Sequence, residues 1–353
     1  MLKKERIPII FFALLSLVCG LWTGLTRIGW DARAFALSAH HGAIMVSAFL
    51  GTLITLEKII PLRNKFLYAI PVINASSVAV FFIGQPRVAC YITVASSLAL
   101  SVVFLHYLNK QRSLVYLLML AGSVCWLVGN ILILTKSFYP LAFPWWASFA
   151  LFVISAERME LMQFLPVATL HKSSFVSLLG MFLIGCFFSF HGAGNLFCGF
   201  ALIGISLWLM RFDITAVNLK KSGLPQFVAV ALLAAYAALL FTGVFFISLP
   251  NQWLSYDAIV HSFFLGFVFS MIFAHGPIIL PNVLGIRVTH FSPLAYGWLA
   301  ILHLSWMVRI FGDITVHLVA RKVSGAMSAV AIIGYFITLA IVIVRSHRHV
   351  KVV

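Results

Sequence analysis

The sequence predicts an all-α polytopic membrane protein with about twelve transmembrane helices in a single domain, residues 1–353. Three observations predict this class. Of the 353 residues, 63% are hydrophobic and only 9% are charged. The mean hydropathy is +1.08, which is more apolar than soluble globular domains are. Apolar windows of about twenty residues recur along the whole chain, separated by short connections.

The first helix is expected to be uncleaved, because its apolar run is long and no small-residue cleavage site follows it. We assign the prolines that separate the apolar windows to connections, namely Pro61, Pro86, Pro140, Pro166, Pro250 and Pro293. The expected helices, in order, are 7–25, 39–60, 66–84, 88–108, 113–134, 144–165, 175–190, 196–212, 224–249, 256–280, 293–311 and 325–345.

The basic residues predict the orientation. There are 24 Lys and Arg residues against eight Asp and Glu, a net charge of +16. Most of the basic residues fall in alternate connections and in the C-terminal tail, which places those segments inside. We therefore expect a multi-pass protein of the bacterial inner (cytoplasmic) membrane, with both termini cytoplasmic. We attribute the positive charge to basic residues that fix the orientation of the protein in the lipid bilayer. No nucleic-acid partner is expected.

The five cysteines all fall in apolar segments without CxxC spacing, so we interpret them as small buried hydrophobes. Twelve histidines in so apolar a chain are more unusual.

His41 and His261 are the main chemical lead. His41 lies about two residues into the second expected helix (39–60), and His261 about five into the tenth (256–280). Both helices run inward, so both histidines lie within ~10 Å of the outer surface by helix rise. A histidine in a membrane helix is costly without a partner or metal. We expect the pair to bind a b-type haem between these helices, with His40 competing with His41. The alternative is two interfacial histidines bonded to backbone or water.

A haem also needs positive charge near its propionates. Arg321 and Lys322, in the last outside connection, are the first candidates. Arg27 and Arg33 could serve at the same surface, and Arg309, at the outer end of the eleventh helix, is an alternate.

Residues 41–62, HGAIMVSAFLGTLITLEKIIPL, resemble the second helix of the haem-copper oxidase catalytic subunit. Residues 261–276, HSFFLGFVFSMIFAHG, resemble its tenth helix. In that family the two histidines ligate the low-spin haem, and the subunit is a twelve-helix bundle. The pattern is closer to the NnrS-like branch, small membrane proteins linked to haem, copper and nitric oxide. The resemblance implies a haem held by His41 and His261, with a redox or gas-ligand role.

The chain departs from the oxidases at their copper centre. The expected sixth helix contains no histidine, and the seventh has only His191. The residue two before His261 is Ile259, where the oxidases have a second histidine. An ordinary oxygen-reducing terminal oxidase is therefore not expected, and whether the chain is an oxidoreductase stays open. His303 is kept as a candidate ligand for a second metal or haem, with copper as a candidate cofactor and a quinol or cytochrome as a candidate electron donor.

Ionisable residues also gather near the inner surface, and such residues usually face the bundle interior and pair. His275 lies ~21 Å deeper than His261 by helix rise, so it is not expected to reach the same iron. The cluster predicts a proton-uptake path or a quinol site, or else structural salt bridges in which Arg158 neutralises a glutamate. Its members are Glu57, Glu157, Arg158, Glu160 and His275.

Two other functions fit the same sequence. A cofactor-free proton-coupled transporter or permease would use this inner cluster, and an assembly partner of a respiratory complex would need no metal.

Overall fold

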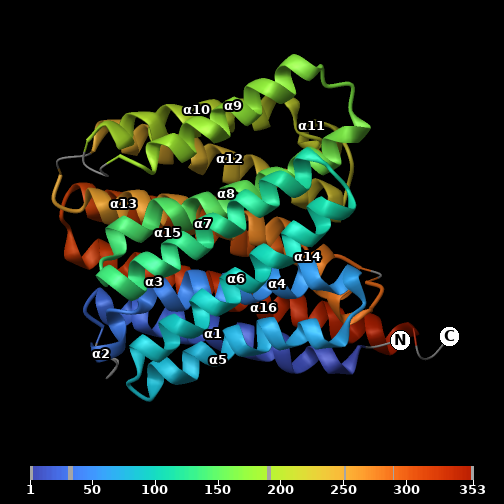
Figure 1. The fold of residues 1–353 in the computed structure, drawn as a ribbon, viewed down its shortest axis with the longest axis horizontal. Coiled ribbons are helices and arrows are strands. Elements are labelled where there is room, and N and C mark those ends of the chain that lie inside the picture. The colour runs from blue at the N-terminus through green and yellow to red at the C-terminus, as the bar shows by residue number, and fades with distance from the viewer. Residues whose placement is uncertain (1–2, 31–34, 189–191, 250–251, 289, 351–353) are drawn as a thin grey trace. The chain divides into compact units, whose positions relative to one another are not determined.

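The computed structural model describes residues 3–30, 35–188, 192–249, 252–288 and 290–350. Arg33 and His191 lie outside these ranges. Every regular element in the described residues is helical (Figure 1). The chain forms two compact units, Met1–Glu157 and Arg158–Val353.

In its described residues, the N-terminal unit contains six long helices, and the second of them is composite. It begins as α3 (His41–Ala43), continues as a π-helical segment (Ile44–Leu50) and α4 (Gly51–Ile59), and ends in a 3₁₀ turn (Ile60–Leu62). The other long helices are α1 (Ile7–Arg27), α5 (Ala69–Phe82), α6 (Pro86–Lys110), α7 (Leu114–Lys136) and α8 (Tyr139–Leu161), the last of which crosses into the second unit. The short elements are Lys4–Arg6, α2 (Phe35–Ser38) and Lys65–Tyr68.

A buried polar network holds the core of this unit together. The Ser47 hydroxyl, in the π-helical segment, donates to Asn130 Oδ1 at 2.6 Å and accepts from Trp126 Nε1 at 3.1 Å. Trp146 Nε1 also donates to Asn130 Oδ1, at 3.0 Å, and Asn130 Nδ2 donates to the Thr93 carbonyl at 3.1 Å. Satisfied networks of this kind fix a unique packing where no water competes.

The C-terminal unit also contains a composite helix. It runs as α13 (Ser255–His261), a π-helical segment (Ser262–Val268) and α14 (Phe269–Leu284). The other elements are a 3₁₀ turn (Met162–Phe164), α9 (Thr169–Gly185), α10 (Ala193–Phe212), α11 (Thr215–Asn218), α12 (Leu224–Ser248), α15 (Leu294–Ile314) and α16 (Leu318–Val350).

Successive helices in each unit pack as neighbours, as expected for short connections. One close crossing joins α10 to α12. A Cβ added at Gly199 would lie 2.8 Å from the Gly243 carbonyl oxygen, and one at Gly243 would lie 2.7 Å from the Gly199 carbonyl oxygen. Only glycine allows two helix backbones to approach so closely, as small residues do at membrane-helix interfaces.

Eleven helices in the described residues are long and apolar enough to cross a membrane, and α9, with 17 residues, is apolar but shorter. Large apolar side chains such as Phe11 and Tyr91 are exposed on their outward faces. Backbone polar groups in lipid must be satisfied internally, which helices achieve. The chain is therefore a multi-pass helical membrane protein in contact with the bilayer.

Several expected helix boundaries were wrong by a turn or more. Helix α9 begins at Thr169 instead of residue 175, and α16 begins at Leu318 instead of residue 325. Hydropathy windows locate the apolar middle of a helix but omit an early turn that carries basic residues, such as Lys172 in α9 or Arg321 and Lys322 in α16. As a result, Arg321 and Lys322 lie within α16 and not in a connection.

Pro140 was wrongly assigned to a connection. It lies in the first turn of α8, where its missing N–H would have no partner anyway. Pro144 lies further inside the same helix.

Candidate functional site

The His41 ring lies against α1. Its Nδ1 is 2.8 Å from the Gly20 carbonyl oxygen. A Cβ added at Gly24 would lie 2.8 Å from the ring atom Cε1, so the ring packs where α1 has no side chain. A carbonyl oxygen only accepts hydrogen bonds, so Nδ1 carries the proton and the lone pair is on Nε2.

His40 is held less firmly. Its Nδ1 is 3.3 Å from the Tyr139 hydroxyl, and its ring stacks on Phe81 with centroids 5.1 Å apart. Burial lowers the pKa of His40, so this side chain is neutral at pH 7. The shorter bond to a backbone carbonyl makes His41 the better oriented of the two histidines.

His261 is also bonded through Nδ1 to a backbone carbonyl, but within its own helix. Its Nδ1 is 2.8 Å from the Asp257 carbonyl oxygen, one turn earlier in α13, so Nδ1 donates and Nε2 bears the lone pair. The Asp257 carboxylate also approaches, with Oδ1 3.4 Å from Nδ1. Metal-binding histidines are commonly fixed in this way by a carbonyl or carboxylate.

His261 directly precedes a seven-residue π-helical segment, Ser262–Val268, and His41 lies three residues before another, Ile44–Leu50. Such segments are rare in proteins and occur frequently at functional sites. Each unit therefore has a histidine shortly before a π-helical segment.

Beside His261, two arginines and two aspartates form a closed ion-pair network across α13, α15 and α16. Arg309 Nη2 lies 2.5 Å from Asp257 Oδ2, and its Nε lies 3.2 Å from Asp313 Oδ2. Arg321 Nη2 lies 2.9 Å from Asp257 Oδ2, and its Nε lies 2.7 Å from Asp313 Oδ1. The charges balance, so a propionate at Arg309 or Arg321 would compete with these carboxylates. Lys322, half-buried, is the next residue of α16.

His303 on α15 is bonded through Nε2, which is 2.8 Å from the Ser270 hydroxyl. That hydroxyl gives its own proton to the Gly266 carbonyl at 2.7 Å. His303 must therefore donate through Nε2, and a metal would have to bind at Nδ1.

The inner cluster divides into two parts. In the N-terminal unit, Lys58 Nζ lies 2.9 Å from Glu57 Oε1 and 2.5 Å from Glu157 Oε1. In the C-terminal unit, Arg158 Nη2 lies 2.6 Å from His275 Nε2. Glu160 is exposed. Lys58, rather than Arg158 as expected, is thus the cation that pairs with these glutamates.

The contact between Arg158 and His275 fixes the protonation of His275. An arginine only donates, so Nε2 of His275 must accept. Nδ1 of the same ring lies 2.6 Å from the Met271 carbonyl oxygen and therefore carries the proton. His275 is neutral in this arrangement. Arg158 is 3% exposed, and within the described part of the chain its Nε has no hydrogen-bond partner.

A family model described as a domain of unknown function, DUF8744, matches residues 6–345. The chain belongs to this family. The region that defines DUF8744 therefore includes both composite helices and the inner cluster. No curated protein matches the chain, and no solved structure does.

Sequence reasoning missed a buried carboxylate in this DUF8744 chain. Asp213 follows α10, and its Oδ2 accepts from the Thr215 hydroxyl, from the Thr215 amide at 3.3 Å and from the Tyr236 hydroxyl at 3.1 Å. The pattern Asp-x-Thr directly after an apolar helix was the available signal, since aspartate commonly bonds to backbone two residues on. The Asp257 carboxylate was missed because hydropathy windows give no weight to one acid at a helix start.

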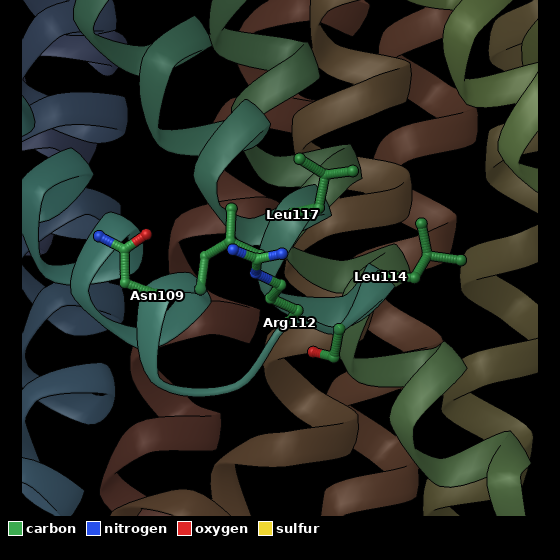
Figure 2. A pocket seen from close by; sticks show the side chains of 6 residues that line it. Asn109, Arg112, Leu114 and Leu117 are labelled. Carbon is green, nitrogen blue, oxygen red and sulfur yellow. The ribbon is translucent and has the colours of Figure 1, made fainter.

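A hollow of about 490 Å³ lies at the turn between α6 and α7 (Figure 2). None of the candidate site residues described above lines it. It is lined by Leu108, Asn109, Arg112, Ser113, Leu114 and Leu117. Among the residues that the structure describes, no group of three or more His, Cys, Asp or Glu side chains could hold a metal ion. Haem differs from such a site, because the porphyrin supplies four ligands and the protein supplies one or two.

Proposed function

We propose that this protein binds a b-type haem through His41 and His261 and has a redox or gas-ligand role, related to nitric oxide. The observation that carries the proposal is the matched state of the two imidazoles. In each, Nδ1 donates to a backbone carbonyl at 2.8 Å, and Nε2 has its lone pair. This is the tautomer in which a histidine ligates haem iron through Nε2.

The resemblance of residues 41–62 and 261–276 to the haem-copper oxidase catalytic subunit, and to its NnrS-like branch, supports the same ligand pair. It also suggests an arrangement of helices like that subunit's, in a bacterial inner membrane. The missing copper-site histidines favour electron transfer or gas binding over oxygen reduction. When bound, the haem would supply the electron or the gas-binding iron. His41 and His261 would orient it, and Arg309, Arg321 and Lys322 are the candidate partners of its propionates.

The experiment is a reduced-minus-oxidised absorption spectrum with a pyridine haemochrome assay on purified protein. Wild type is expected to contain haem, and His261→Ala and His41→Ala to lose the Soret band. His275→Ala and His40→Ala are matched controls that should retain it, because one is bonded to Arg158 and the other stacks on Phe81. A haem-free wild type after haem-sufficient expression would exclude the proposal.

A second candidate, proton-coupled transport without a cofactor, is favoured by one observation. Arg158 is a buried cation whose hydrogen-bond partner is a neutral histidine, and intramembrane ionisable residues often mark ion pathways. The haem assay separates the two candidates. In a haem-free protein, substrate-driven proton influx into proteoliposomes should be lost in Arg158→Gln and His275→Gln and kept in Glu160→Gln.

A further inference from the structure

Two cysteine thiols meet at the junction of α9 and α10. Cys186 Sγ lies 3.4 Å from the Phe182 carbonyl oxygen, and Cys198 Sγ lies 3.7 Å from the same oxygen. Cys186 is 8% exposed and Cys198 2%. Because both sulfur atoms approach one carbonyl oxygen, the two thiols lie near each other before any rearrangement.

The backbones approach closely at the same place. A Cβ added at Gly185 would lie 2.6 Å from Cys198 Sγ and 3.1 Å from the Cys198 backbone nitrogen. A disulfide needs Cα atoms roughly 4.4–6.8 Å apart, so the limiting factor is usually backbone separation. Glycine at position 185 removes the side chain that would hold α9 and α10 apart beside Cys186.

We propose that Cys186 and Cys198 form a reversible thiol–disulfide site. The oxidant is a small-molecule or protein disulfide. The Cys186 thiolate attacks it, one thiol leaves, and a mixed disulfide forms. Cys198 then attacks Sγ of Cys186 and releases the second thiol, so two protein thiols become one disulfide while the oxidant's disulfide becomes two thiols.

The position in the chain suits this chemistry. Cys186 directly follows α9 and precedes two exposed phenylalanines, Phe187 and Phe188, so a reagent reaches it first. The expected orientation puts this connection on the outer side of the inner membrane, where disulfides form and persist.

The test uses full-length protein purified in detergent and treated with oxidised glutathione. After an acid quench, denaturation and alkylation, mass spectrometry counts the free thiols and identifies cross-linked peptides. We expect two of the five thiols to be lost and one peptide pair, containing Cys186 and Cys198, to be joined. Dithiothreitol should restore all five.

Variants supply the controls. Cys198→Ser should stop at a glutathione adduct on Cys186, and Cys186→Ser should give no disulfide. Cys90→Ser, which changes a buried thiol on α6, should still form the bond. Five alkylated thiols in oxidant-treated wild type would overturn the proposal, as would a stable glutathione adduct on Cys186 with Cys198 still free. Both readings come from wild type, so they do not depend on the folding of any variant.

Discussion

The missing side chain of Gly24 makes room for the His41 imidazole. The ring occupies the position where any other residue of α1 would place its Cβ, and this holds Nδ1 on the Gly20 carbonyl. One glycine therefore determines where a polar ring lies in an apolar helix pair. Its role is visible only in three dimensions, because nothing in the sequence around Gly24 differs from an ordinary small residue in a membrane helix.

Gly24→Val should displace the His41 ring. The branched side chain overlaps the ring, and overpacking of this kind costs about 1–3 kcal/mol. We expect a lower thermal unfolding temperature in detergent and, on the proposed function, loss of haem by pyridine haemochrome. Gly297→Val is the matched control, because a Cβ at Gly297 meets nothing within 4 Å. Equal effects of the two substitutions would show that the ring does not depend on Gly24.

At the scale of elements, buried charges join the helices of the C-terminal unit. Asp257 on α13, Arg309 and Asp313 on α15, and Arg321 on α16 satisfy one another with balanced charge. Such a network adds little to folding stability compared with an apolar core of the same shape. Removing one member, however, leaves a buried charge unpaired.

Asp313→Asn should therefore destabilise the protein. The Asp313 side chain is fully buried and accepts from both arginines, so the neutral amide leaves excess positive charge, at a cost of about 3 kcal/mol. Thermal unfolding followed by size-exclusion chromatography would measure this loss. Glu160→Gln, an exposed carboxylate, should change the stability by less than about 0.5 kcal/mol. If the two variants have the same unfolding temperature, the ion-pair network does not stabilise the packing of these helices.

The crossing of α10 and α12 makes a separate prediction. Gly243→Val places a branched side chain against the Gly199 carbonyl, so the helices must move apart and lose close packing. We expect loss of several degrees in unfolding temperature or failure to accumulate in the membrane. Gly180→Val on α9 meets nothing within 4 Å and should behave as wild type. A tolerated Gly243→Val would mean that the backbones need not approach so closely.

At the scale of the whole molecule, the distribution of basic residues predicts that both termini are cytoplasmic. A fluorescent protein that matures only in the cytoplasm should fluoresce when fused to either end, and alkaline phosphatase, active only outside, should be inactive there. Active phosphatase at the C-terminus alone would indicate an odd number of crossings. Activity at both ends would reverse the predicted orientation.

The helical membrane class could be predicted from the sequence, because a segment that spans lipid must be apolar along its length and mean hydropathy measures this directly. Hydropathy misplaced the starts of α9 and α16, where the basic residues Lys172, Arg321 and Lys322 lower the local hydropathy. The rings of His41 and His261 could be named as candidates from sequence, but their tautomers depend on the Gly20 and Asp257 carbonyls. The Asp257–Arg309–Asp313–Arg321 network joins residues up to 64 positions apart, so no local pattern reveals it.

The bond between His41 and Gly20 also bears on how the protein is made. The two residues are only 21 positions apart and belong to neighbouring spans that leave the ribosome before the later helices of this sequence. A lone imidazole entering lipid would carry an unsatisfied polar group. Here the donor Nδ1 can find its acceptor within the first hairpin, before any later helix exists. The two spans that carry Gly20 and His41 can therefore insert as a pair in which the Nδ1–H group of His41 is already hydrogen-bonded.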